Sequence, residues 1–262
     1  MAEPLLHVQD LTKHFELGSG RTLHAVDGVS FTLAQEEILG LVGESGSGKS
    51  TLGKTLLGLL DKTAGTVRFE GETLPQRYRA QDHRRLATRM QMIFQDPYAS
   101  LNPRMTVYET LSEPLLYHGL ATRQTLDSQV RQLMEDVGLA CNQMRKYPHE
   151  FSGGQRQRIA IGRAIACGPE LIVADEPVSA LDVTIQAQIL DLLLALVERH
   201  NLTLLFISHD LSVVRAISDR IMVMKRGVII ESANTETLWA EPKQEYTRQL
   251  LQAIPQVEKN NR

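Results

Sequence analysis

One segment restricts the possible folds of this chain more than any other. Residues 43–50 read Gly-Glu-Ser-Gly-Ser-Gly-Lys-Ser and fit the pattern GxxxxGK[ST] without a mismatch. The apolar run 38–42 before it is typical of a buried strand, and residues 51–60 after it have apolar positions at helical spacing. Strand, glycine-rich loop and helix in this order form a phosphate-binding loop in α/β proteins. The sequence therefore predicts a nucleotide triphosphate site, and the flanking elements argue against an ordinary glycine-rich turn.

The residue types in this loop suit phosphate chemistry. Gly43, Gly46 and Gly48 let the backbone pass close to phosphate oxygens and turn its N–H groups toward them. The following helix adds the positive end of its dipole. Lys49 is expected to offset charge on the β- and γ-phosphates, and the Ser50 hydroxyl to ligate Mg²⁺.

Two acidic residues follow a second apolar run, residues 171–174. Asp175 then stands at the carboxyl end of a predicted central strand, where open α/β sheets bind their ligands, and is expected to face the magnesium. Glu176 is expected to polarise the water that attacks the γ-phosphate. The alternative is an exposed acidic pair at a strand end, which the upstream phosphate loop disfavours.

Other polar residues also end predicted strands. Gln95 follows residues 92–94, where its amide could sense the magnesium or the attacking water. His209 ends the run 204–208 and is expected to hydrogen-bond the γ-phosphate, although alone it would be read as a surface or capping histidine. Phe15 could stack on a purine or be an ordinary packing aromatic.

A second glycine-rich helix start lies at Ser152-Gly153-Gly154-Gln155. A serine and free N–H groups at a helix start can bind an anion, or the serine can simply cap the helix. Together with the phosphate loop, this segment suggests a phosphate site completed by another copy of the chain.

The remaining pattern indicates an α/β organisation. Short apolar runs with turns across residues 5–41 suggest antiparallel strands, and residues 106–139 look like an inserted helical region with breaks at Pro114 and Gly119. Strand and helix patterns alternate again after residue 171, which predicts a mainly parallel sheet covered on both faces.

Composition and local sequence argue against several function classes. The net charge of −3 gives no global basic excess that would point to nucleic acid. The N-terminus lacks the features of a secretion signal, and the apolar segments are too short to cross a bilayer. We therefore expect no export, and a membrane role would need another subunit to provide the span. The two cysteines are expected to have reduced thiols and to serve as packing residues.

Taken together, these motifs resemble the ATPase subunit of ATP-binding cassette (ABC) transporters, from about residue 5 to residue 255. The resemblance implies an α/β fold with a P-loop NTPase (RecA-like) core, an antiparallel β subdomain and an inserted α-helical subdomain. It implies one ATPase domain, residues 1–240, in which 1–95 form the β subdomain and the first part of the core. Residues 96–165 would form the helical subdomain, 166–240 the rest of the core, and 241–262 a C-terminal tail.

The resemblance also implies a role for each motif, with ATP and Mg²⁺ as cofactors. The implied catalytic residues are Glu176, His209 and Gln95. The implied magnesium ligands are Ser50, Gln95 and Asp175. The implied ATP-binding residues are Phe15, Gly43, Ser45, Gly46, Gly48, Lys49, Ser50, Thr51, Ser152, Gly153, Gly154, Gln155 and Asp182.

In that family two cassettes close head to tail, so Ser152 and Gly154 of one subunit would meet the γ-phosphate held by the other. The signature motif usually begins with leucine and here begins with Phe151. This departure leaves the phosphate-contacting serine and glycine intact.

Residues 94–103 and 174–183 are similar to the ATPase subunits of dipeptide, oligopeptide and nickel importers, as is the segment 246–255. This likeness implies two integral membrane permease subunits, a second homologous ATPase or a self-dimer, and an extracytoplasmic solute-binding protein. It places the chain at the cytoplasmic face of the inner (plasma) membrane, with residues 96–103 bordering the groove for a coupling helix. Peptide import is the first expectation, with nickel or a metal chelate as the alternative.

Two other classes stay open at this point. One is a soluble cassette protein that acts on ribosomes or nucleic acid, although such proteins commonly carry two cassettes or a long coiled coil. The other is a nucleotide-binding regulatory module without turnover, which the intact Glu176 and His209 disfavour.

Overall fold

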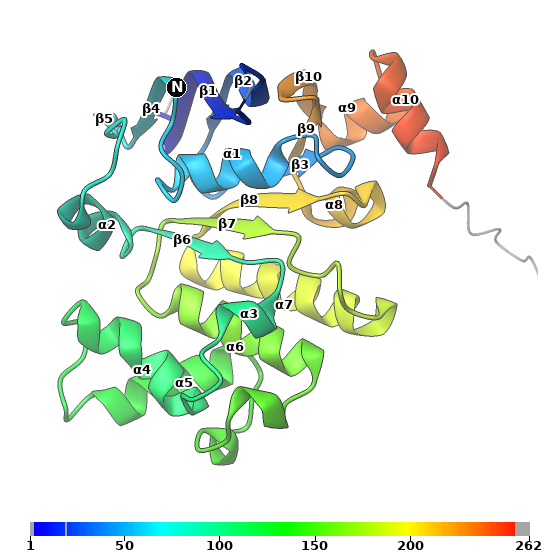
Figure 1. Cartoon of the computed structure of the whole chain (residues 1–262). Coiled ribbons are helices and arrows are strands. Elements are labelled where there is room, and N and C mark those ends of the chain that lie inside the picture. The colour runs from blue at the N-terminus through cyan, green and yellow to red at the C-terminus, as the bar shows by residue number, and fades with distance from the viewer. Residues whose placement is uncertain (1–2, 19, 255–262) are drawn as a thin grey trace, which may run out of the picture.

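The computed structural model describes residues 3–18 and 20–254 (Figure 1). Ser19 of the predicted first turn and residues 255–262 of the predicted tail lie outside the described residues. The first of two sheets is antiparallel, in the order β2-β1-β4-β5. Its strands are β1 (Leu6–Glu16), β2 (Thr22–Leu33), β4 (Ala64–Phe69) and β5 (Glu72–Thr73).

The second sheet has six strands, in the order β10-β9-β3-β8-β7-β6. They are β3 (Ile38–Val42), β6 (Met90–Ile93), β7 (Leu171–Asp175), β8 (Thr203–Ser208), β9 (Arg220–Lys225) and β10 (Val228–Asn234). All neighbouring pairs are parallel except β9 and β10. Every residue of β3, β7 and β8 is buried, as expected for parallel strands covered on both faces.

The helices cover both faces of this parallel sheet (Figure 1). Helix α1 lies between the two sheets, α6 and α7 cover the opposite face, and α4 and α5 lie beyond them as an outer layer. The α-helices are α1 (Lys49–Leu56), α2 (Ala80–Leu86), α3 (Pro97–Ser100), α4 (Val107–Tyr117), α5 (Leu126–Asp136), α6 (Gly153–Ile165), α7 (Val183–His200), α8 (Leu211–Ile217), α9 (Thr235–Ala240) and α10 (Glu245–Gln252). Two short 3₁₀ turns span Cys141–Gln143 and Pro148–Glu150. Across the described residues, none of the helices is long and apolar enough to span a bilayer.

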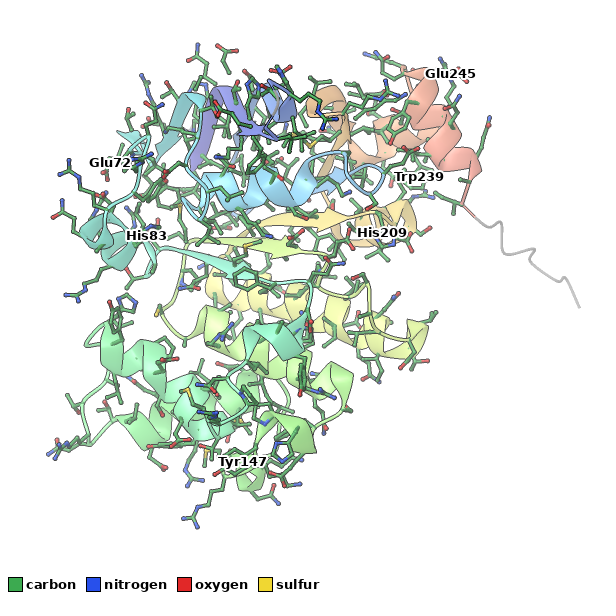
Figure 2. All side chains as sticks on the ribbon, in the orientation of Figure 1. Glu72, His83, Tyr147, His209, Trp239 and Glu245 are labelled. Carbon is green, nitrogen blue, oxygen red and sulfur yellow. The ribbon has the colours of Figure 1, made fainter. Side chains whose placement is uncertain are left out.

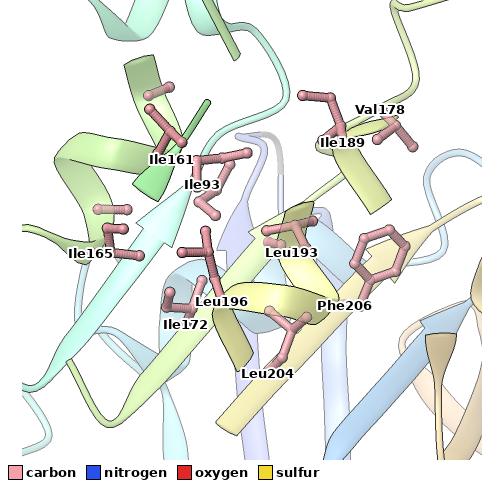
Figure 3. Packing of buried hydrophobic residues seen from close by; sticks show 14 of the residues in the cluster. Ile93, Ile161, Ile165, Ile172, Val178, Ile189, Leu193, Leu196, Leu204 and Phe206 are labelled. Carbon is pink, nitrogen blue, oxygen red and sulfur yellow. The ribbon is translucent and has the colours of Figure 1, made fainter. Parts of the chain in front are cut away.

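Alternation along the strands creates two hydrophobic clusters. Leu39 and Leu41 of β3 belong to the cluster shared with α1 and the antiparallel sheet, whereas Ile38 and Val42 belong to the cluster under α6, α7 and α8. Figure 3 shows the second cluster, where side chains of β7 and β8 meet Leu193 of α7 and its neighbours. The core therefore fixes the carboxyl ends of the strands, from which the site is built.

Helix α4 differs from the sequence expectation because it continues through Pro114. Proline in a helix interior costs roughly 3 kcal/mol. Leu111 and Leu115 flank it one turn apart and are both buried in the core. Burying two leucines contributes about 3–6 kcal/mol, which outweighs the proline. The break at Gly119 does occur, with φ of 68° directly after the helix.

Candidate functional site

The loop between β3 and α1 approaches two neighbouring backbone segments closely. Gly48 has φ of 108°, and a Cβ atom there would lie 2.0 Å from the carbonyl oxygen of Ala25. A Cβ atom on Gly43 would lie 2.2 Å from the carbonyl oxygen of Met224. Only glycine fits such contacts, so the loop is tied to β2 and β9 and its N–H groups converge before α1.

Lys49 opens α1 and is buried, with only 4% of the residue exposed. Its Nζ donates to the carbonyl oxygens of Gly43 at 2.7 Å and Glu44 at 2.9 Å. Burial lowers the pKa of Lys49, and the nearby carboxylates of Glu176 and Asp175 act in the opposite direction. The ammonium group of Lys49 is thus held against the loop, where it could contact a bound phosphate.

A cavity of about 840 Å³ lies against this loop. It brings together residues that the sequence predicts for the site: Phe15, Gly43, Ser45, Gly46, Gly48, Lys49, Ser50, Thr51, Gln95, Glu176 and His209. The volume and the cationic, N–H-rich wall suit an adenine nucleotide. Phe15 is half-buried at the hairpin side of the cavity, with Lys13 Nζ 4.8 Å from its ring centre.

Ser50 and Asp175 meet at the edge of the parallel sheet. The Ser50 hydroxyl donates to Asp175 Oδ1 at 2.7 Å. Asp175 is 3% exposed, and this burial raises its pKa, whereas the bond from Ser50 works in the opposite direction. A hydroxyl and a carboxylate are the hard oxygen ligands that Mg²⁺ takes, so this pair fits the ion.

Glu176 is held by side chains from the ends of β6 and β8, the two strands that flank β7. Gln95, after β6, donates its Nε2–H to Glu176 Oε2 at 3.1 Å. The Nδ1 atom of His209, directly after β8, lies 3.1 Å from the same oxygen. Figure 2 shows His209 at the carboxyl end of β8. The φ of Glu176 is 47°, a strained value for a non-glycine residue, and its N–H donates to the carbonyl of Ile207.

Ser152, Gly153, Gly154, Gln155 and Asp182 lie apart from this cavity and do not line it. Ser152 caps α6: its Oγ accepts from the N–H of Gln155 at 3.3 Å, and Gln155 Oε1 accepts from the N–H of Ser152 at 3.0 Å. Asp182 caps α7 by accepting from the N–H of Ile185 at 3.0 Å. Ser152 and Gly153 are exposed, so this surface is open to a second molecule.

Several residues of the site were not predicted from the sequence. Arg226 lines the cavity although no motif marks it, and Leu250 lines it although the resemblance of the segment 246–255 implies no role in the site. The hydroxyl of Tyr246 in α10 accepts a hydrogen bond from the N–H of Glu44 at 3.1 Å. These contacts depend on how β9 and α10 fold back over the loop, which local patterns do not show.

Comparison with known proteins defines the class. Residues 26–179 match the ABC transporter family, and this stretch is more than half of the chain. The chain belongs to this family, and it is an ATP-hydrolysing cassette. The dimeric ATP-binding cassette MJ0796, solved with ADP and Pi, is 27% identical with a TM-score of 0.80, over 88% of this chain and 98% of that one. The predicted P-loop NTPase fold is confirmed.

Two relatives are more similar in sequence. A putative peptide import ATP-binding protein of Brucella ovis is 52% identical over 96% of this chain and 79% of its own length. The oligopeptide transport ATP-binding protein OppF of Bacillus subtilis is 51% identical over 97% of this chain and 84% of its own length.

We expect Asp175→Asn to stabilise the fold at neutral pH in the absence of magnesium. Because burial raises the pKa of Asp175 above its ordinary value of 3.8, the unfolded chain ionises first as pH rises. The folded chain therefore loses stability as pH rises from 3.8 through the higher pKa of Asp175 in the folded state. Asparagine does not ionise and so avoids this loss, while its side-chain oxygen can still accept the hydrogen bond from Ser50. The melting temperature at pH 7 should rise, and the difference should shrink toward pH 4.

Thermal unfolding across this pH range checks the prediction, with Asp191→Asn on the exposed face of α7 as the control. An equal or lower melting temperature for Asp175→Asn at pH 7 would contradict it. The same variant should hydrolyse ATP far more slowly, because it lacks the proposed magnesium ligand.

Proposed function

We propose that this chain is the ATP-hydrolysing subunit of an importer for di- or oligopeptides. The convergence of the phosphate loop, Asp175 and Glu176 at one sheet edge carries the hydrolytic part of the proposal. The names of the two relatives at about half identity over nearly the whole chain support the peptide part.

In the proposed reaction, the loop N–H groups and Lys49 hold the phosphates, and Phe15 stacks on the adenine. Mg²⁺ would be held by Ser50, Asp175 and Gln95 and would neutralise charge between the β- and γ-phosphates. Glu176 orients and polarises the attacking water.

Gln95 and His209 keep the Glu176 carboxylate in place, since both contact Oε2. His209 is 55% exposed, so it can turn toward a γ-phosphate, while Glu176 is only 13% exposed. Phosphoryl transfer depends on such positioning and charge placement more than on covalent help.

A second cassette would complete each site. Ser152 and Gly154 start α6 on a surface outside the cavity, so they can reach a γ-phosphate only in another subunit. A Cβ atom on Gly154 would lie only 2.4 Å from Cγ2 of Ile185 in α7. Glycine at this position therefore lets α6 pack closely against α7, the helix that Asp182 caps. The partner is a homologous ATPase or a second copy of this chain.

An apolar groove of about 500 Å³ offers a place for the membrane subunits. Leu59 lies at its rim, 49% exposed, beside Phe94 and Tyr117, with Glu113 and Arg163 as charged groups. Residues 96–103 do not line it, but they begin two positions after Phe94. We assign this groove to a coupling helix of the permease. In this proposal each of the two cassettes receives one of two permease subunits, at the cytoplasmic face of the membrane.

The whole assembly in this proposal also contains an extracytoplasmic solute-binding protein, bound through the permease. In this proposal residues 96–165 form a helical subdomain that moves when nucleotide binds. Its movement would transmit the closure of the two cassettes to the groove. The segment from residue 241 packs on the nucleotide loop through Tyr246.

Isolation of the assembly tests the proposal. The tagged chain is extracted gently from native membranes and its stoichiometric partners are identified by mass spectrometry. We expect two multi-span proteins and a second cassette, and ATPase activity that rises when the binding protein carries a peptide. Leu59→Arg should reduce recovery of the multi-span proteins about tenfold or more, because it places a charge in the groove.

Leu17→Arg is the matched control, since Leu17 is also exposed, at 59%, but does not line the groove. Recovery of ribosomes or nucleic-acid proteins without membrane subunits would reject the transport role. If nickel or a metal chelate stimulated the ATPase activity and peptide did not, peptide would be rejected as the substrate, and the transport role would stand.

A further inference from the structure

Three potential metal ligands meet on the hairpin that precedes the phosphate loop. His14 of β1 and His24 of β2 are direct cross-strand partners, and their ring centres lie 3.8 Å apart. Asp27 follows on β2, and the ligand atoms of all three residues lie within 4.8 Å of one another.

The spacing of these atoms allows weak hydrogen bonds and also suits a shared cation. His14 Nε2 lies 3.3 Å from Asp27 Oδ1, and His24 Nδ1 lies 3.4 Å from Asp27 Oδ2. Charge-assisted N–H···O bonds are typically about 2.7–2.9 Å. Tetrahedral ligands at about 2.0–2.1 Å from zinc stand about 3.3 Å apart, which agrees with the two separations between histidine and carboxylate atoms.

The surroundings leave this carboxylate available to a cation. Among the described residues, the only basic side chains within ion-pair distance of Asp27 are the two histidines. The Asp27 backbone is fixed, because its N–H donates to the carbonyl of Gly227 at 2.8 Å. The side chains of His24 and Asp27 are 52% and 47% exposed, which leaves an entry path and room for water ligands.

We propose that His14, His24 and Asp27 form a binding site for a borderline divalent cation of the Zn²⁺ class. Two imidazoles and one carboxylate, with water in the fourth position, are a ligand set that Zn²⁺ takes and that Mg²⁺ does not favour. The site is separate from the Ser50–Asp175 pair.

The proposed site adjoins the nucleotide cavity. His24 lines that cavity, and His14 directly precedes Phe15. Gly227, which holds Asp27, also donates its N–H to the carbonyl of Ser47 in the phosphate loop at 2.8 Å. A bound cation would join the two hairpin strands at the wall of the cavity, so it can influence nucleotide affinity, and linkage makes any such effect reciprocal.

Metal titration of the untagged, nucleotide-free chain tests the site, since ATP itself binds Zn²⁺. Zn²⁺ competes against a chromophoric indicator in excess Mg²⁺, and Co²⁺ serves as a visible probe of tetrahedral geometry. We expect one equivalent of Zn²⁺ and intense visible Co²⁺ bands. Asp27→Asn and His14→Gln should each weaken Zn²⁺ binding at least about tenfold and remove the bands.

His200→Gln is the control, an exposed histidine at the end of α7 that should bind Zn²⁺ unchanged. Thermal unfolding confirms that each variant is folded. The two variants change residues on different strands, so the site can still be tested if one of them misfolds. Absence of stoichiometric Zn²⁺ binding by the unchanged chain would overturn the proposal. Unchanged affinity in the folded variants would also overturn it, because the ion would then lie elsewhere.

Discussion

Glu176→Gln is expected to bind ATP as tightly as the unchanged chain but to hydrolyse it roughly 10²–10⁴-fold more slowly, the usual contribution of a general base. Glutamine keeps the size of the side chain and can still accept from Gln95, but it lacks the charge that polarises the attacking water. ATP that is bound and not hydrolysed should hold two cassettes together, so the variant should also accumulate closed dimers.

Steady-state phosphate release, fluorescent-nucleotide binding and size-exclusion chromatography with ATP measure these three effects. Glu198→Gln, an exposed change on α7, should behave like the unchanged chain in all of them. Normal ATP turnover by Glu176→Gln would show that Glu176 does not activate the attacking water. The assignment of the cavity to ATP would still stand.

Lys49→Ala should lose ATP binding itself. The ammonium group is buried and close to where the phosphates are proposed to bind. Removing one partner of such a charge pair costs about 2–5 kcal/mol, which corresponds to roughly thirtyfold to several thousandfold in affinity. Hydrolysis at ordinary ATP concentrations should then fall to background.

The shift of the melting temperature by saturating ATP separates lost binding from lost folding. The unchanged chain should be stabilised by ATP, because a ligand that binds the native state raises its stability, and Lys49→Ala should show little or no shift. Lys146→Ala, at an exposed position in the helical part, should retain the full shift. A normal ATP shift in Lys49→Ala would show that the phosphates bind elsewhere.

Local patterns predicted the elements that position the site with small errors. The strand at residues 38–42 has the predicted bounds. The first helix begins at Lys49 rather than residue 51, because Gly48 in the left-handed region caps it. Helix α4 was predicted to break at Pro114, since the pattern could not weigh the packing of the leucines around it.

The sequence also predicted which residues would gather at the strand ends, because the carboxyl ends of parallel strands share one edge. It could not predict Arg226, Leu250 or Tyr246, which come from the β9–β10 turn and from α10 and contact the loop only through the tertiary fold. Such contacts join residues far apart in the chain and carry no periodic signal.

The order of strands in the parallel sheet affects how the protein is made. β3 lies between β8 and β9, and the Tyr246–Glu44 bond joins residues 202 positions apart. At about 5–20 residues per second, the ribosome needs roughly 10–40 s to make that intervening chain. Until residues 203–208 of β8 have been made, the apolar strand before the nucleotide loop has neither of its sheet partners. The nascent chain therefore leaves this apolar strand unpaired for most of its synthesis, and the contact between Tyr246 and the nucleotide loop forms only when synthesis is nearly complete.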